Sequence, residues 1–254
     1  MNNNPARISG SGHFGGGEYS DIHVSGSGRF EGDIKVDDTI KTSGSAHFSG
    51  NVETNELSSS GNARIEGNLT CRKELRTSGT VRIGGDVKAH LLRSSGSCRI
   101  NGNLSGSITE VSGSCSVEGC VSMQKVNVSG TMSCKEFEAE QLRLIGSLAV
   151  EAFLNAGEML INRHSSCCAK EIGCETLTVT EGFGLNLLRF FGKRTIRANV
   201  IEGDTLHLIS VEADVVRGKD IFVGEDCRIG LVEYSGTLTV RGGQIENEVK
   251  LETE

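Results

Sequence analysis

The sequence predicts an all-β protein, a single-stranded parallel β-helix solenoid with rungs of 16–18 residues, where a rung is one turn of the solenoid. Three observations predict this fold. One glycine-centred motif recurs with that period, the residues after each glycine alternate between apolar and polar, and the composition suits a strand-rich chain. The 254 residues include 34 glycines, one proline and no tryptophan. Because aromatic residues are scarce, stacked aliphatic rows must supply most of the buried area.

A marker glycine, usually preceded by serine, begins each repeat. Four residues later stands a mostly apolar residue, six later another glycine, and eight later, from the second rung on, an aliphatic residue. The marker glycines are Gly10, Gly26, Gly44, Gly61, Gly79, Gly96, Gly113, Gly130 and Gly146. The residues four positions after them begin Phe14, Phe30, Phe48, Ile65, Ile83, Ile100 and Val117.

Alternation after the marker indicates a strand with one buried and one exposed face. The repeated Ser-Gly, Gly-Asn and Gly-Asp pairs are typical of turns, and we expect some of these glycines to need positive φ. A rung of about 17 residues cannot bury its apolar face alone, so rungs must stack, about 4.8 Å apart. A third aliphatic row closes many rungs: Ile40, Leu57, Leu75, Leu92, Ile108 and Val126.

The winding is predicted to be right-handed. A left-handed β-helix repeats one aliphatic residue every six positions, whereas here the paired apolar positions, such as Ile65 and Leu69, are four apart. We expect a disordered tail over residues 1–7, regular rungs over 8–150 and irregular rungs or an excursion over 151–200. C-terminal rungs follow over 201–247, where Gly218 and Gly236 resemble markers, and a charged tail over 248–254.

Charge and cysteine content restrict the function classes. The net charge of −7 argues against a nucleic-acid partner, whose phosphates require cationic contacts. No apolar run approaches the roughly 20 residues that span a bilayer, and no secretory signal is visible. We therefore expect a cytoplasmic protein, with membrane association left open, whose nine cysteines are free thiols.

The runs SGSGRFEGDIKV, SGNARIEGNLTC, SGTVRIGGDVKA and SGSCRINGNLSG resemble the repeats of the bactofilins, bacterial polymer-forming cytoskeletal proteins. The resemblance covers about residues 8–150 and 200–247. It implies a right-handed β-helix that polymerises end to end into cytoplasmic filaments without nucleotide. It also implies roles in cell shape, envelope organisation or motility, with a homo-polymer as the main assembly and a paralogous filament protein as a further partner.

The two ends of the solenoid are the first candidate site. Each end exposes an unpaired strand row and an open apolar cross-section, which must be capped or used for pairing. The flanking segments are too polar to form apolar lids, although tails folded over the ends are the alternative. The predicted polymer-interface residues are Ile8, Phe14, Leu238, Val240 and Ile245.

A column of basic residues three positions after the marker is the second candidate: Arg29, His47, Arg64, Arg82 and Arg99. Stacked like charges are destabilising, so such a column could dock an anionic surface such as lipid or an acidic protein. The alternative is a solvated ladder that Glu31 and Glu66 neutralise. An Asn/Asp column is interpreted as structural: Asp33, Asn51, Asn68, Asp86 and Asn103.

Two further features have competing interpretations. His164, Cys167, Cys168 and Cys174 fit the spacing of zinc ligands poorly, and no metal site is predicted. Cys98 and Cys115 are expected to be small buried residues. The most apolar stretch is either packed on the solenoid or a partner-binding or membrane loop. The loop residues would be Phe183, Leu187, Leu188, Phe190 and Phe191.

No motif carries convincing catalytic chemistry, and no catalytic residue, cofactor or cofactor-binding residue is predicted. The sequence GKRT at 192–195 lacks the glycine and hydroxyl positions of a P-loop. The leading hypothesis is a non-enzymatic structural protein that self-assembles. The alternatives are a carbohydrate-active β-helix enzyme, by analogy of fold alone, and a monomeric scaffold that co-assembles with a filament partner.

Overall fold

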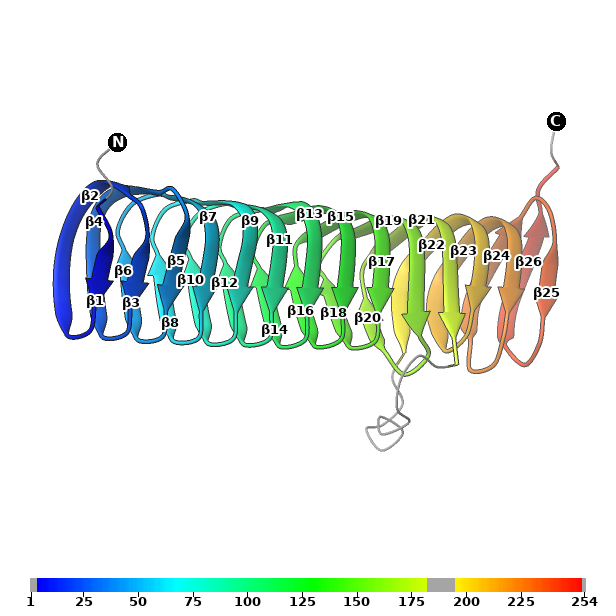
Figure 1. Ribbon diagram of the computed structural model, residues 1–254. Coiled ribbons are helices and arrows are strands. Elements are labelled where there is room, and N and C mark those ends of the chain that lie inside the picture. Colours follow the sequence, from blue (N-terminus) through cyan, green and yellow to red (C-terminus); the bar gives the residue numbers. More distant parts are fainter. Residues whose placement is uncertain (1–3, 182–194, 253–254) are drawn as a thin grey trace. The chain divides into compact units, whose positions relative to one another are not determined.

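A computed structural model describes residues 4–181 and 195–252, and the described residues form strands and turns with no helix. The chain divides into two compact units, unit 1 (residues 1–124) and unit 2 (residues 125–254). Figure 1 labels the strands of both.

The strands of unit 1 are β1 (Ala6–Ile8), β2 (Ser11–Tyr19), β3 (Ile22–Val24), β4 (Ser27–Val36), β5 (Thr39–Thr42), β6 (Ser45–Phe48), β7 (Val52–Ser59), β8 (Asn62–Ile65), β9 (Leu69–Thr77), β10 (Thr80–Ile83), β11 (Val87–Ser94), β12 (Ser97–Ile100), β13 (Leu104–Val111) and β14 (Ser114–Val117). The boundary between the units falls within β15 (Cys120–Val128).

The strands of unit 2 are β16 (Thr131–Cys134), β17 (Glu136–Leu144), β18 (Ser147–Val150), β19 (Phe153–Asn162), β20 (Ser166–Cys168), β21 (Glu171–Thr180), β22 (Ile196–Leu208), β23 (Val211–Val223), β24 (Arg228–Tyr234), β25 (Leu238–Val240) and β26 (Gln244–Lys250).

Parallel pairing between successive rungs confirms the predicted fold class. In unit 1, each short strand pairs with the short strands of neighbouring rungs, as β10 does with β8 and β12. The longer strands pair in the same way, as β9 does with β7 and β11. Figure 1 shows this side-by-side stacking within each unit. The protein is therefore a β-solenoid, and its right-handed winding stays a prediction.

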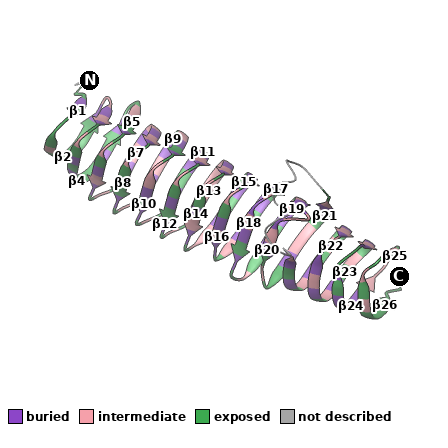
Figure 2. Ribbon diagram, turned by 90° about the horizontal axis from the view of Figure 1, so that it is seen from below, coloured by how far each residue is buried: buried purple, intermediate pink, exposed green. Residues whose placement is uncertain are grey.

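The core consists of inward columns that run from rung to rung. The column four positions after the marker stacks Phe30 on Phe48 and Ile65 on Ile83, and all four are at most 1% exposed. Figure 2 shows the alternation of buried and exposed residues along the strands. Burying many aliphatic side chains, at about 25 cal/mol per Å² of apolar surface, stabilises the stack without a large aromatic core.

The third inward column lies four residues before the next marker glycine. It contains Leu75 opposite Leu92, and then Leu92 opposite Thr109. The prediction of Ile108 in this row was wrong, because Ile108 pairs with Leu91 and points less deeply into the core. The number of residues between the marker glycine and this column varies from rung to rung. The column is therefore found correctly by counting four residues back from the next marker glycine.

Marker glycines are required by the close approach of neighbouring rungs. A Cβ on Gly61 would lie 2.1 Å from the carbonyl oxygen of Gly44, and a Cβ on Gly79 would lie 2.1 Å from that of Gly61. Neither position has positive φ. The expectation of positive φ was therefore wrong for these Ser-Gly turns, and steric contact between stacked backbones explains the glycine instead. It is confirmed at Gly32, in a Gly-Asp pair, whose φ is 83°.

The Asn/Asp column forms the predicted structural ladder. Each side-chain Oδ1 accepts the backbone N–H of its counterpart one rung later, as when Asp86 donates its N–H to Asn68 at 2.8 Å. The chain of such bonds joins Asp33 to Asn51, Asn51 to Asn68, Asn68 to Asp86, Asp86 to Asn103 and Asn103 to Cys120. The preceding glycines are required by the ladder, because a Cβ on Gly85 would lie 2.2 Å from Asn68 Oδ1.

Unit 2 keeps the marker contact between Gly130 and Gly146, and its later rungs have different turns. Residues 153–181 contain β19, β20 and β21, which pair with neighbouring rungs as the strands of unit 1 do. Gly218 lies inside β23 opposite Gly203, so its assignment as a marker was wrong. The turns before β23, β24 and β26 instead contain Ser210, Asp226 and Gly242, whose φ values are 55°, 58° and 87°.

Candidate functional site

The N-terminal rung presents a partly open aromatic stack. The ring of Phe14 stacks on Phe30 with centroids 5.3 Å apart, and Phe30 stacks on Phe48 at 4.8 Å. Phe30 and Phe48 are fully buried, whereas Phe14 is half-buried because only one face of its ring is covered. Ile8, in β1, is 5% exposed and pairs with Val24.

Gly10 is the marker glycine of this rung, and it lacks the contact that defines the other markers. A Cβ on Gly26 would lie 2.0 Å from the carbonyl oxygen of Gly10. A Cβ on Gly10 would meet nothing within 4 Å among the described residues. The first rung therefore keeps the small residue that stacking requires, although no described rung is stacked against Gly10.

The C-terminal rung consists of β25 and β26 and is more polar. Val240 is 45% exposed, while Leu238 and Ile245 are half-buried. Ile245 continues the inward column through its pairing with Ile229. In the next inward column, the buried Val232 pairs with Glu248, which puts a carboxylate at an inward position of the last rung. Inward-pointing charges disfavour pairing at a strand edge.

The predicted basic residues lie directly opposite one another on successive rungs of unit 1. The pairings run from His13 to Arg29, His47, Arg64, Arg82, Arg99 and then Ser116. His13 extends the predicted set by one rung. We call His13, Arg29, His47, Arg64, Arg82 and Arg99 the basic column.

Glu31 and Glu66 neutralise part of the basic column, as the solvated-ladder interpretation expected. Glu31 contacts His13 at 3.0 Å and Arg29 at 3.9 Å. Glu66 contacts His47 at 2.9 Å and Arg64 at 2.8 Å, and hydrogen bonds from these two residues lower the pKa of its carboxyl.

Arg82 and Arg99 differ from the rest of the column. Within the part of the chain that the structure describes, neither has a carboxylate oxygen at ion-pairing distance. The positions that hold Glu31 and Glu66 on earlier rungs are Gly84 and Asn101 beside these arginines. Both side chains are exposed. The column therefore carries two adjacent, uncompensated guanidinium groups.

A shallow groove of about 540 Å³ follows the column across four rungs. Its walls are basic on one side, from Arg29 to Arg82, and hydroxyl or amide on the other, from Ser27 to Thr80. Gly28, Ala46 and Ala63 also line it. The groove is lined by polar side chains and by these small residues, and its lining holds no large apolar side chain.

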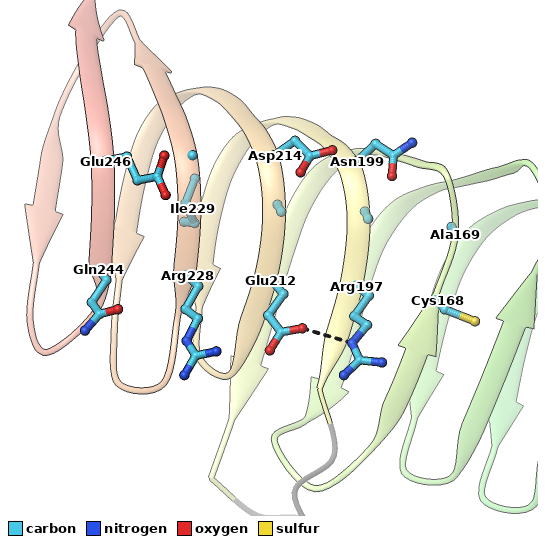
Figure 3. Close-up of a pocket in the computed structure, with 13 residues that line it drawn as sticks. Cys168, Ala169, Arg197, Asn199, Glu212, Asp214, Arg228, Ile229, Gln244 and Glu246 are labelled. Carbon is cyan, nitrogen blue, oxygen red and sulfur yellow. Dashed lines mark hydrogen bonds and ion pairs between the residues drawn. The ribbon is translucent and has the colours of Figure 1, made fainter.

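The same column of unit 2 has alternating charge. Arg197, Glu212, Arg228 and Gln244 lie opposite one another in sequence. Arg197 Nε donates to Glu212 at 2.9 Å, as Figure 3 shows. These residues line a groove of about 480 Å³ that also contains Asp214. The side chains of this groove pair with each other or alternate in sign, so they need no external counter-ion.

Six of the nine cysteines are buried in the core, whereas Cys168 is exposed. Cys98 and Cys115 are buried and lie opposite each other, and hydrogen bonding to Cys115 together with burial raises the pKa of Cys98. Burial raises the pKa of Cys167 to about 12. Across residues 4–181 and 195–252, no group of three or more His, Cys, Asp or Glu side chains could hold a metal ion.

The predicted apolar loop lies outside the described residues, with all five of its residues: Phe183, Leu187, Leu188, Phe190 and Phe191. Elsewhere, no helix among the described residues has the length and apolar character needed to cross a membrane.

Sequence reasoning missed two features of these sites. It did not identify the special position of Gly10, although a glycine in the first repeat was visible. It also missed the inward column two residues before the marker glycine, which holds Thr42, Ser59, Thr77 and Ser94, all at most 2% exposed. Its hydroxyl periodicity was the signal.

Comparison with known proteins agrees with the predicted resemblance. Residues 6–105 match a family model described as Bactofilin: Polymer-forming cytoskeletal. Two proteins of Bacillus subtilis (strain 168) are similar in part: the uncharacterized protein YhbE is 38% identical over 105 residues, 40% of this chain and 44% of that protein. The uncharacterized protein YhbF is 39% identical over 84 residues, 32% of this chain and 34% of that protein.

The chain thus spans less than half the length of the curated relatives it matches. No solved structure matches it. The resemblance is therefore confirmed over residues 6–105, the part of the chain that matches the bactofilin family of polymer-forming cytoskeletal proteins.

Proposed function

We propose that this chain is a non-enzymatic structural protein that self-assembles end to end into cytoskeletal filaments without nucleotide. The proposal places it in the cytoplasm, as a homo-polymer, with a paralogous filament protein and a membrane surface as further partners. Roles in cell shape, envelope organisation or motility follow from the resemblance. The family match over residues 6–105, described as polymer-forming, supports the proposal.

The observation that carries the proposal is the unused space at Gly10. In unit 1 a marker glycine is needed where the preceding rung's carbonyl lies about 2 Å from the Cβ position. Gly10 has no such neighbour, and Phe14 exposes one ring face on the same rung. A rung from a second copy would fill both positions. Ile8 is only 5% exposed, so it would stabilise the rung that makes this contact more than contribute surface to it.

The C-terminal contact of the proposal involves Leu238, Val240 and Ile245. If the C-terminal rung of one copy stacks on the N-terminal rung of the next, Val240 would lie in the same inward column as Ile8 of the second copy. Ile245 would lie in the same inward column as Phe14 of the second copy. Glu248 makes this end less favourable for an apolar contact. We therefore expect the N-terminal rung to contribute more to assembly than the C-terminal rung.

Substitution of terminal residues tests the proposal. Phe14→Arg and Val240→Arg should each abolish sedimentable polymers while leaving a folded monomer, because a charge at a stacked rung is desolvated without a partner. Phe153→Arg is the matched control, since Phe153 is 52% exposed on β19, a strand that pairs with rungs on both sides. Ultracentrifugation and electron microscopy without nucleotide measure assembly, and circular dichroism reports the fold.

The outcomes separate the alternatives. Filaments in wild type and Phe153→Arg but not in Phe14→Arg support the proposal. Unchanged pelleting of both terminal variants, or a monomeric wild type, would overturn it.

A further inference from the structure

We infer that the basic column docks on the phosphate headgroups of an anionic lipid surface, with Arg82 and Arg99 as the main contacts. The inference deepens the membrane contact included in the proposed function by assigning it a site. It does not depend on end-to-end assembly, because the whole column lies in unit 1 of one chain.

The basic column stacks like charges over six successive rungs. In-register stacking puts equivalent side chains about 4.8 Å apart, so like charges on successive rungs repel. Elsewhere a carboxylate relieves such repulsion. Arg76 and Arg93 also lie opposite each other, but Glu74 contacts them at 3.0 and 3.3 Å, and Lys35 contacts Glu18 at 3.1 Å one rung away. Arg82 and Arg99 lie directly opposite each other with no such relief.

The chemistry around these arginines suits phosphate. A guanidinium group donates two parallel hydrogen bonds to one phosphate, and two stacked groups can share several oxygens. Thr80 and Ser97, two positions earlier on the same strands, add exposed or half-exposed hydroxyls. No large apolar side chain lines the groove, so the contact would be electrostatic and at the depth of the headgroups.

The geometry favours a planar surface over an extended acidic peptide. Successive rungs present basic groups in a straight row about 4.8 Å apart. Acidic side chains on one face of an extended peptide repeat at about 6.6 Å, twice the rise per residue, and lose register with that row within a few residues. Mobile lipid headgroups need no matching period, and each nearby arginine contributes about 1 kcal/mol.

Vesicle flotation tests the inference, because filaments alone do not float with lipid. The full chain is mixed with vesicles of phosphatidylcholine, with or without 30% phosphatidylglycerol, in about 50 mM salt. Wild type should float only with the anionic vesicles and detach in about 0.5 M salt. Arg82→Gln/Arg99→Gln should lower the partition coefficient about 30-fold, the equivalent of two arginines at about 1 kcal/mol each.

The matched control is Arg197→Gln/Arg228→Gln, which removes the same charge from the equivalent column of unit 2. It should float like wild type. Equal loss in both double variants would show that net charge alone matters and would overturn the site. Binding of inorganic phosphate at Arg82 and Arg99 without flotation would overturn the lipid assignment.

Electron microscopy of the same samples keeps the two proposals apart. The Arg82/Arg99 variant should still form filaments, and Phe14→Arg should still require Arg82 and Arg99 for any flotation it retains. Failure of flotation with normal filaments counts against the lipid site only.

Discussion

Unit 1 and the later rungs of unit 2 differ in their turns, although unit 2 keeps one marker contact, since a Cβ on Gly146 would lie 2.0 Å from the carbonyl oxygen of Gly130. In unit 1, marker glycines allow backbones to approach closely, and side-chain oxygens of the Asn/Asp column accept a backbone N–H from the next rung. In unit 2, Ser210, Asp226 and Gly242 turn through positive φ, and β22 and β23 each extend over 13 residues. The solenoid therefore continues after its visible repeat ends.

The lateral columns differ in the same way. Unit 1 keeps one sign of charge from His13 to Arg99, while unit 2 alternates from Arg197 to Glu212 and Arg228. Figure 3 shows the self-paired arrangement. Both arrangements are compatible with stacking, so uniform charge is not a requirement of the fold.

The largest effect is expected for a methyl group on a marker glycine. Gly61→Ala puts a Cβ 2.1 Å from the oxygen of Gly44 and should lower the free energy of unfolding by at least about 3 kcal/mol. Gly173→Ala, in unit 2, puts its Cβ 3.4 Å from the nearest atom and should change stability by less than about 0.5 kcal/mol. Urea unfolding compares the two, and equal losses would contradict the steric explanation.

A smaller loss is expected when the Asn/Asp ladder is interrupted. Asn68→Ala leaves the N–H of Asp86 without its acceptor and should cost about 1 kcal/mol, whereas Asn68→Asp keeps the oxygen and should cost less. Because Asn68 Oδ1 also occupies the space beside Gly85, Gly85→Ala should be better tolerated in the Asn68→Ala background. A double-mutant cycle measures this, and simple additivity would argue against the contact.

At neutral pH the smallest effect is expected for the buried thiols, whose contribution to stability changes only at alkaline pH. Burial raises the pKa of Cys71 to about 11 and of Cys167 to about 12, from an ordinary 9.0. Above pH 9 the folded state keeps thiol protons that the unfolded state releases. The thiols' contribution to the free energy of unfolding is therefore fully present below pH 9 and falls as pH rises above it. Each thiol contributes at most about 1.4 kcal/mol per pH unit over its window.

Substitution separates the two thiols. Cys71→Ala should remove its part of the slope between pH 9 and 11, and Cys167→Val should remove its part up to pH 12. Urea titrations at several pH values measure the slopes. Unchanged slopes in both variants would show that the thiols titrate alike when folded and unfolded.

The repeat predicted the fold of unit 1 because one steric requirement recurs at each rung. The residues at the inward positions, such as Phe30 and Leu69, are found in the expected columns. Prediction failed at Ile108 and Gly218, where rung length varies and the spacing in sequence no longer equals the spacing in register. The turns before β23, β24 and β26 lack the marker glycine, so no local sequence pattern predicted where they lie.

The sequence predicted which residues of the candidate sites lie in one column. It predicted less well which of them form ion pairs. The spacing of Arg82 and Arg99 placed them on one face. Whether Glu31 and Glu66 would reach the column depended on side-chain geometry that spacing does not specify. The importance of Gly10 could be recognised only after the role of Gly26 was known from the contact between rungs.

The Asn/Asp ladder also has a direction. Every oxygen in it belongs to the earlier rung and every N–H to the later one. Because the ribosome delivers the N-terminal rungs first, each acceptor is in place before its donor is synthesised. A nascent chain can thus fold by templated addition, in which each completed rung supplies the hydrogen-bond acceptor for the next rung.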